Sequence, residues 1–337
     1  MNKKNTILAF LLAIWVIAAF ADDANVSIAP IEQWSNVFGG KESVFHFAVS
    51  ADKVVQGRLG WHFSTSGRTI VRGEAQVAVE PGQPETVEIR LRVPEVKAGV
   101  IMQALLSVSV LGTREATSGC EKEIWIYPED AFAIRKEWLK KLKIRLFDPE
   151  KKTAEQFENA EIPFEAARNI DSFTEITNGI VVIGEGISFK EYHGLSDMMV
   201  KTAARGIPVL CLAPAAGDMT IPGMGDSDLP VPTSMLFRQN EIITELDKRL
   251  DADAWPPDGK VKVSSIMLKG EKGPVIGEMQ EGGNKWPWIE LKFGEKGRFI
   301  FCGFGIIKKW ASGPTPRFLF VKLLEYIHGK QSEVSSQ

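Results

Sequence analysis

The spacing of the apolar residues changes once along the chain, and this change is the strongest constraint on the fold. From Val26 to Tyr127, short stretches of alternating apolar and polar residues are separated by turn residues, with no long helical pattern. Alternation with a period of two, broken about every 8 to 12 residues, is typical of antiparallel sandwiches. We therefore predict an immunoglobulin-like β-sandwich over residues 26–128, with Trp61 as a buried aromatic plug.

After Pro128, short apolar strands alternate with helical patterns. The stretch KIRLF at 143–147 is a strand ending at Asp148, and Thr153 to Gln156 has the spacing of a capping box that opens a helix. Ile180 to Ile183 and residues 208–213 are further strands, separated by a helix. Strands that alternate with helices favour a parallel sheet covered by helices. We predict a doubly wound, flavodoxin-like, mostly parallel sheet over residues 129–329.

The last third departs from this rhythm. Residues 214–235 predict a long loop rich in glycine, proline and aspartate, followed by a helix over Glu241 to Leu250. Two hairpins then carry the same tetrapeptide, Gly-Glu-Lys-Gly, at 270–273 and at 294–297. A final helix starts at Thr315, and its apolar positions should pack on the sheet. The tail over 330–337 is polar, and we predict that it is loose.

The first 21 residues have the layout of a secretory signal. Lys3 and Lys4 precede an apolar stretch over 7–19, and Ala19-Phe20-Ala21 is a small-x-small cleavage site. The apolar stretch is short for a membrane span, which needs about 20 residues. We predict cleavage after Ala21 and export to the periplasm or beyond the cell, with no stable membrane span afterwards. Retention as an N-terminal membrane anchor is the alternative.

Charge and cysteine usage narrow the function classes. Without the two signal lysines, 38 basic residues face 43 acidic ones, a formal net charge of −5. This balance argues against nucleic acid as a partner, because such binding needs clustered basic residues. Cys211 and Cys302 lie in strand patterns, and Cys120 lies in a polar loop without an obvious partner. No cofactor site and no metal site is indicated.

The Gly184-Glu185-Gly186 turn follows the strongest strand and holds the main candidate site. In open parallel sheets, ligands gather beyond the carboxyl ends of the strands. Asp148 should lie on the same rim. The two carboxylates suit an acid and base for glycoside hydrolysis, or a cation site. The structural alternative is that Asp148 caps its turn and Glu185 pairs with a helix N-terminus or a lysine, and we favour it.

Other candidates lie near this rim. Ser188 lacks the second glycine of a serine nucleophile motif, and Ser188 with Glu191 fits a capping box better. Asp218 and two further aspartates, Asp226 and Asp228, lie in the loop expected to overhang the rim. Trp286 and Trp288 could form a flat surface for a sugar ring, although tryptophans before a strand are more often buried anchors.

We find a resemblance to a known family in four stretches: LFDPEKKTAEQFENAEIPFE, GIVVIGEG, GIPVLCLAP and GRFIFCGFGIIKKWASGPTPRFLFVKLLEYI. They resemble the class I glutamine amidotransferase-like domain, in the form found in exported bacterial proteins and in β-galactosidase trimerisation domains. The preceding sandwich resembles the immunoglobulin-like modules of glycoside hydrolase family 2 proteins. The resemblance spans roughly residues 30–328. It rests on the pattern and order of elements.

The sequence departs from that family at the catalytic positions. A working amidotransferase has a cysteine between glycines at a strand-to-helix turn, with a histidine and a carboxylate from a later segment. Neither candidate turn, 184–186 or 213–217, contains a cysteine, and the only late histidine is His328. A thiol nucleophile needs a base within hydrogen-bond reach. We therefore predict no glutaminase activity.

Three hypotheses of function follow. The first is an exported, non-catalytic binding or assembly protein, with carbohydrate or another exported protein as its partner. Its link to carbohydrate metabolism is implied only by the resemblance. The second is a glycoside hydrolase that uses Glu185 and Asp148. The third is an interaction scaffold that forms a homo-oligomer.

Overall fold

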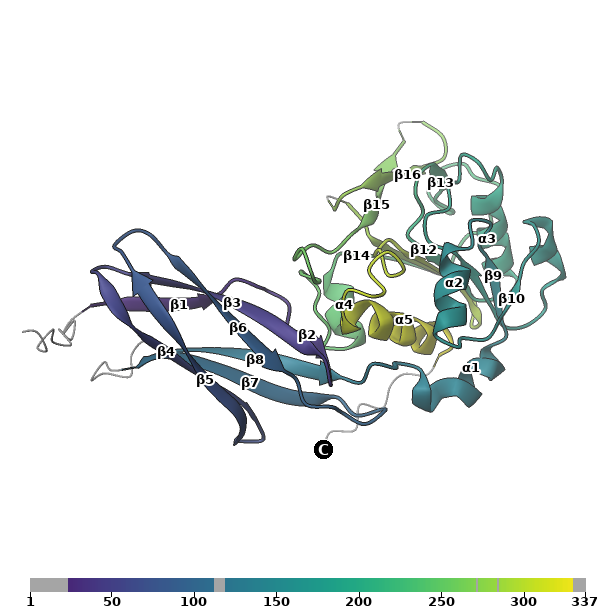
Figure 1. The fold of residues 1–337 in the computed structure, drawn as a ribbon. Coiled ribbons are helices and arrows are strands. Elements are labelled where there is room, and N and C mark those ends of the chain that lie inside the picture. Colours follow the sequence, from purple (N-terminus) through teal and green to yellow (C-terminus); the bar gives the residue numbers. More distant parts are fainter. Residues whose placement is uncertain (1–23, 112–118, 271, 284, 330–337) are drawn as a thin grey trace, which may run out of the picture. The chain divides into compact units, whose positions relative to one another are not determined.

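The structure is a computed structural model that describes residues 24–111, 119–270, 272–283 and 285–329 (Figure 1). The predicted signal peptide (1–21) and the predicted loose tail (330–337) lie outside these residues. Strands dominate the described chain, which divides into two compact units. No helix of the described residues is long and apolar enough to cross a membrane.

The first unit contains most of a β-sandwich, which lies in the region of alternating apolar and polar residues. Its sheets have the orders β1-β3-β6 and β2-β8-β7-β4-β5. The strands are β1 (Val26–Pro30), β2 (Asn36–Phe38), β3 (Glu42–Ala51), β4 (Val55–Thr65), β5 (Arg68–Val79), β6 (Glu85–Arg92), β7 (Met102–Leu111) and β8 (Gly119–Tyr127). In β6 the apolar residues Val87, Ile89 and Leu91 are buried, while Glu88 and Arg90 face solvent. The alternating pattern therefore places one face of each strand in the core.

Trp61 differs from its prediction as a buried plug. It is partly exposed, and its ring lies across Gly73 on the neighbouring strand β5. A Cβ atom added to Gly73 would lie 2.5 Å from Cζ2 of Trp61. The missing side chain of Gly73 therefore provides the space that the indole fills.

The two units are not simple successive halves of the chain. Glu32–Lys41, Arg92–Met102 and the end of β8 from Ile124 group with the second unit. Strand β2 pairs in parallel with Trp125–Tyr127 at the end of β8. These segments pack by long-range contacts, which the local pattern of the sequence does not reveal.

The second unit contains a mixed seven-stranded sheet with the order β10-β9-β11-β12-β18-β17-β14. The first five strands run parallel, β17 is antiparallel to β18, and β14 is antiparallel to β17. These strands are β9 (Ile144–Phe147), β10 (Phe164–Ala166), β11 (Ile180–Ile183), β12 (Val209–Leu212), β14 (Ser234–Arg238), β17 (Trp288–Phe293) and β18 (Gly297–Cys302). A smaller sheet has the order β13-β16-β15 and is formed by β13 (Asp218–Thr220), β15 (Ser264–Lys269) and β16 (Ile276–Glu281).

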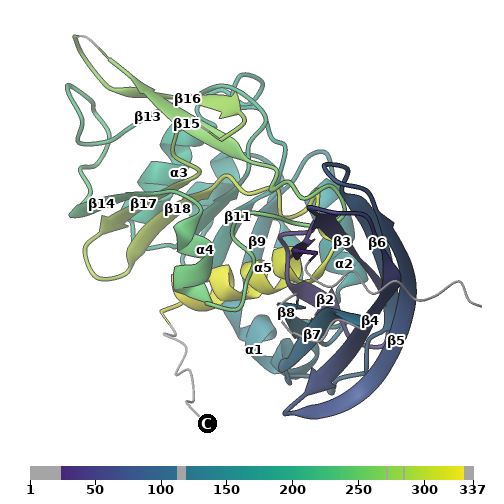
Figure 2. The ribbon, with the colours of Figure 1, turned by 90° about the vertical axis from the view of Figure 1, so that its left-hand side faces the viewer.

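Helices cover both faces of the seven-stranded sheet (Figure 2). Helices α1 (Lys136–Leu142), α2 (Lys152–Asn159), α4 (Glu241–Leu246) and α5 (Pro314–Ile327) contribute to one core, and α3 (Leu195–Ala204) to the other. The apolar positions predicted to pack α5 on the sheet are all buried: Phe318, Leu319, Val321, Leu323, Leu324 and Ile327. Strands β11 and β12 are buried at every residue, as expected for strands covered on both faces.

Some predicted boundaries were wrong. The predicted loop over 214–235 contains β13 and the start of β14, because Asp218–Thr220 pairs with β16. Helix α4 ends at Leu246 instead of Leu250. The two predicted hairpins are confirmed as the β15–β16 and β17–β18 pairs.

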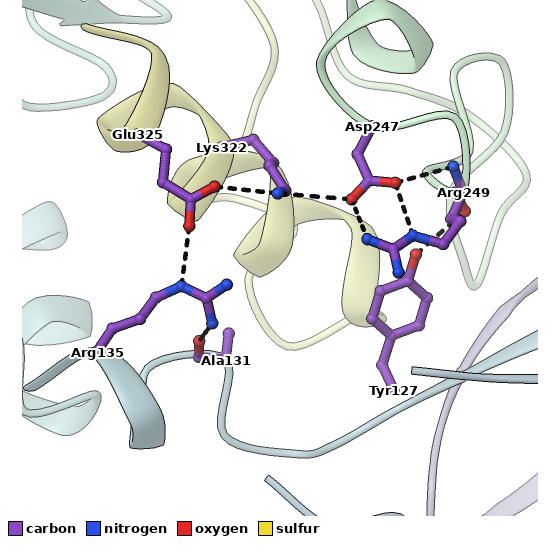
Figure 3. Close-up of polar contacts among 7 residues, drawn as sticks. All are labelled: Tyr127, Ala131, Arg135, Asp247, Arg249, Lys322 and Glu325. Carbon is purple, nitrogen blue, oxygen red and sulfur yellow. Dashed lines mark hydrogen bonds and ion pairs between the residues drawn. The ribbon is translucent and has the colours of Figure 1, made fainter. Parts of the chain in front are cut away.

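A network of polar contacts involves two residues of α5, Lys322 and Glu325 (Figure 3). The guanidinium of Arg249 binds both oxygens of Asp247, and Lys322 lies between Asp247 and Glu325. Glu325 also accepts a hydrogen bond from Arg135 at 3.0 Å. Burial alone would raise the pKa of Asp247, but the bonds from Arg249 outweigh it and hold that pKa below its usual value. These contacts therefore connect α5 to the segments that contain Arg135 and Asp247.

Candidate functional site

The rim at the carboxyl ends of β9 and β11 brings the two main candidate residues together. Phe147 and Ile183 are partners in the parallel pair, so Asp148 and Gly184 follow side by side. A Cβ atom on Gly184 would lie 2.7 Å from Oδ1 of Asp148, which makes this close approach specific to glycine. Glu185 is the next residue along the turn.

Glu185 uses its carboxylate to hold a distant part of the chain. The backbone N–H of Ile307 donates to Oε2 at 2.7 Å, and that of Lys308 donates to Oε1 at 3.0 Å. Burial raises the pKa of Glu185 to about 7, although these two hydrogen bonds and the charge of Lys308 act in the opposite direction. The carboxylate therefore caps the turn that leads from β18 to α5.

Asp148 caps the start of α2. Its Oδ2 accepts a hydrogen bond from the backbone N–H of Ala154 at 2.8 Å, as in other carboxylate caps. Its Oδ1 is buried and has no hydrogen-bond partner among the described residues. Burial raises the pKa of Asp148 above its usual value, against the hydrogen bonds from the helix N-terminus.

The predicted capping box at Thr153 is not formed. Helix α2 begins at Lys152, and the buried hydroxyl of Thr153 accepts the backbone N–H of Glu185 at 2.9 Å. The Thr153 hydroxyl therefore accepts its hydrogen bond from the end of β11, and not from an N–H of its own helix as the capping box predicts. Thr153 is a rim residue that sequence reasoning missed.

The capping box predicted for Ser188 and Glu191 is also not formed, because α3 begins later, at Leu195. Ser188 instead forms an isolated parallel bridge with Ala216. The chain from Gly186 to Phe189 runs beside residues 213–216, with backbone hydrogen bonds between them. The two turns proposed as nucleophile positions therefore bind each other.

The cysteines of the second unit are enclosed. Cys211 is fully buried on β12 in one core, and Cys302 is fully buried on β18 in the core of the opposite face. Burial raises the pKa of the Cys211 thiol and raises that of Cys302 to about 12. All three cysteines are free, and His328 packs against Trp138. A buried thiol with a raised pKa does not form the thiolate that nucleophilic attack requires.

The remaining candidates lie on or beside other strands, β13 and β17. Asp218 is exposed at the start of β13, opposite Glu278. Trp288 is buried in the core that contains α5, whereas Trp286 is partly exposed, packs against the opposite core and meets Phe237 edge-on at 5.7 Å. The two rings lie on opposite faces of the sheet, so they do not form one stacking surface. Within the described ranges, no group of three or more His, Cys, Asp or Glu residues is placed to hold a metal ion.

A buried carboxylate on β17 was not anticipated. Glu290 on β17 is 1% exposed, and its Oε2 accepts a hydrogen bond from the hydroxyl of Tyr326 at 2.7 Å. Nε of Arg298 lies 3.3 Å from its Oε1. Burial raises the pKa of Tyr326 to about 12. The sequence indicates this residue in one way, as a glutamate inside the otherwise apolar start of the strand WIELKF. The hydrogen bond between Tyr326 and Glu290 joins α5 to the sheet.

Comparisons with known proteins do not place the chain in a family. No family model matches the sequence, and no curated protein matches it. Among solved structures, a β-glucosidase from Listeria innocua in complex with glucose has a TM-score of 0.24 at 11% identity, covering 31% of this chain and 16% of that one. A cycloisomaltooligosaccharide glucanotransferase from Paenibacillus sp. has a TM-score of 0.30 at 9% identity, covering 77% of this chain and 34% of that one.

A CARDB domain from Pyrococcus furiosus, in complex with metal ions, has a TM-score of 0.22 at 13% identity and covers 31% of this chain and 88% of that domain. The chain thus spans about a sixth of the length of the β-glucosidase that it partly matches. Likenesses at these scores carry no argument about function.

Proposed function

We propose that this chain is an exported binding or assembly protein whose second unit is a non-catalytic relative of the class I glutamine amidotransferase-like domain. One observation carries the proposal. At 184–186, one of the two turns that could correspond to the family's nucleophile turn, the central residue is Glu185, and both of its carboxylate oxygens accept backbone hydrogen bonds. The Glu185 carboxylate therefore has a structural role, because it binds the backbone at Ile307 and Lys308.

The order of the parallel strands supports the doubly wound fold within this proposal. Numbered by their sequence, β10, β9, β11, β12 and β18 lie in the order 2-1-3-4-5. This is the order of flavodoxin-like sheets. The enclosed Cys211 supports the absence of thiol chemistry. The predicted signal peptide supports export, and the carbohydrate link rests on the resemblance alone.

A glycoside hydrolase is the second candidate, and one observation favours it. Burial raises the pKa of Glu185 to about 7, which would keep this group protonated near neutral pH, as a general acid requires. Asp148 would supply the second carboxylate from the same rim. The hydrogen bonds that Glu185 accepts from Ile307 and Lys308 argue against this role, because proton donation needs an oxygen that faces a substrate.

Turnover assays separate the two candidates. Purified protein should release no ammonia from glutamine and should cleave none of a panel of aryl glycosides. Glycoside cleavage that Glu185→Gln abolishes, while Glu191→Gln on the exposed part of the same segment retains it, would overturn the proposal. Circular dichroism of both variants confirms that they are folded.

Binding is tested by electrophoresis through gels that contain single polysaccharides. Retardation by one of them would identify carbohydrate as the partner class. Unchanged mobility in all of them would exclude the carbohydrates tested and leave another exported protein as the partner.

A further inference from the structure

The free edge of the sandwich has an unusual length. Strand β5 (Arg68–Val79) ends the five-stranded sheet and pairs there only with β4. It has 12 residues, whereas β6, another strand at a sheet edge, has 8. Edge strands can pair with other chains, and proteins usually protect them by shortness, by charged side chains and especially lysine, by proline or by bulges. The charged residues of β5 are Arg68, Arg72 and Glu74. Strand β5 contains no lysine and no proline.

A bulge interrupts the ladder near the start of β5. Val71 is opposite Phe63 and Thr69 is opposite Ser64, so Ile70 is an extra residue at a bulge. From Val71 to Val79 the ladder with β4 is regular. The edge from Val71 to Val77 thus remains available for pairing, and it ends before Ala78, whose N–H is bonded to Glu85.

The direction of the backbone groups on this edge follows from one hydrogen bond. The N–H of Ala78 donates to the carboxylate of Glu85 at 2.7 Å, so it points away from β4. Backbone groups alternate in direction along an antiparallel strand. The N–H and C=O groups of Arg72, Glu74 and Gln76 therefore also point outward, and no hydrogen bond from another described residue reaches them.

The charges on this edge are complementary to themselves. If two copies of β5 pair antiparallel about Gly73, Arg72 of each copy lies opposite Glu74 of the other. Arg72 is exposed and has no ion pair within the described part of the chain. Among the described residues, the ion pair of Glu74 is with Arg58, at 2.8 Å and near solvent. Opposite charges at facing positions stabilise strand pairs.

The centre of the edge is shaped for close approach. In this register the two copies of Gly73 face each other as a pair without hydrogen bonds, where Cα atoms lie about 4.5 Å apart. Gly73 presents no side chain there. The partly exposed ring of Trp61 covers it from one face and supplies apolar surface at the axis. We propose that β5 is a self-association edge, which pairs antiparallel with β5 of a second copy about Gly73.

This proposal goes beyond the proposed function and is independent of it. It uses residues of the sandwich alone, so catalysis or inertness at Glu185 would leave it unchanged.

Sedimentation velocity over a series of concentrations tests the proposal. The purified protein should change from monomer to dimer as its concentration rises. Arg72→Glu and Glu74→Arg each place like charges at two equivalent positions, and each should weaken dimerisation by about tenfold. The double variant Arg72→Glu with Glu74→Arg restores opposite charges and should restore the dimer.

The control is Arg92→Glu at the end of β6, which makes the same change of charge at another exposed position and should leave dimerisation unaltered. Circular dichroism of the two single variants checks that they are folded. A protein that is monomeric at every concentration would overturn the proposal. So would a dimer that neither single reversal weakens, or a defect that the double variant does not correct.

Discussion

The hydroxyl oxygen of Thr153 accepts the backbone N–H of Glu185 at 2.9 Å, across 32 residues of sequence. The carboxylate of Glu185 in turn accepts the N–H groups of Ile307 and Lys308. The start of α2, the end of β11 and the turn before α5 therefore meet at one residue. The rim therefore connects three segments of the chain, and the contribution of each hydrogen bond to the free energy of unfolding can be measured.

The hydroxyl of Thr153 should matter for stability. Thr153→Val removes the acceptor and leaves the N–H of Glu185 without its partner at a partly buried position. We expect the free energy of unfolding to fall by about 1–3 kcal/mol in urea titrations. Thr153→Ser keeps the hydroxyl and should lose less. Equal losses in the two variants would show that the hydrogen bond contributes nothing.

Glu185 should make stability depend on pH in an unusual direction for a carboxylate. Its pKa rises from 4.5 to about 7 on folding, so the folded protein binds this proton more tightly than the unfolded chain does. Its stabilising contribution is full below about pH 4.5 and is lost as the pH rises to about 7. Relative to Glu185→Gln, the wild type should lose up to about 3 kcal/mol of unfolding free energy across that range.

Urea titrations of both proteins at several pH values give this difference directly. Because both proteins share every other titrating group, the comparison isolates Glu185. A difference that stays constant with pH would mean that the pKa of Glu185 is the same in the folded and unfolded states.

The hydrogen bond between Tyr326 and Glu290 should stabilise the packing of α5. Tyr326→Phe removes the donor to a carboxylate that is 1% exposed, and we expect a loss of about 1–3 kcal/mol in unfolding free energy. Tyr192→Phe is the matched control, since Tyr192 is partly buried and its hydroxyl has no hydrogen bond to another described residue. Similar losses for the two variants would argue against a special role for the buried pair.

The thiols should differ in reactivity. Cys211 and Cys302 are fully buried, whereas Cys120 is partly exposed. Burial raises the pKa of the Cys120 thiol, while the charge of Lys122 acts in the opposite direction. A thiol reagent should modify one cysteine in the native protein and three in denaturant, and native Cys120→Ser should not react. Rapid modification of Cys211 in the native state would contradict the enclosed position of its thiol.

The sequence predicted the elements better than their ends. Alternation located the sandwich strands, and fully apolar stretches located β11 and β12, because burial of one or both faces leaves a periodic trace in the residues. Local motifs were less informative. Thr153-x-x-Gln156 and Ser188-x-x-Glu191 both have the spacing of a capping box, yet their hydroxyl-bearing residues bond to, or pair with, distant parts of the chain.

The candidate site shows the same division. The order of strand and turn predicted that Asp148 and Glu185 share a rim, since parallel strands end at one edge. The sequence did not indicate that Ile307 and Lys308 bind the carboxylate of Glu185, because those amides belong to a segment more than 100 residues away.

The sequence by itself determined where most strands and helices lie, except β13 and the start of β14, and where a polar rim must lie, since these follow from periodicity and from local backbone preferences. The tertiary structure alone decided which group each rim residue binds, on which face Trp286 and Trp288 lie, and that Cys211 is enclosed. The physical reason is that a hydrogen-bond partner and a degree of burial depend on atoms brought together from distant positions, and no local pattern records them.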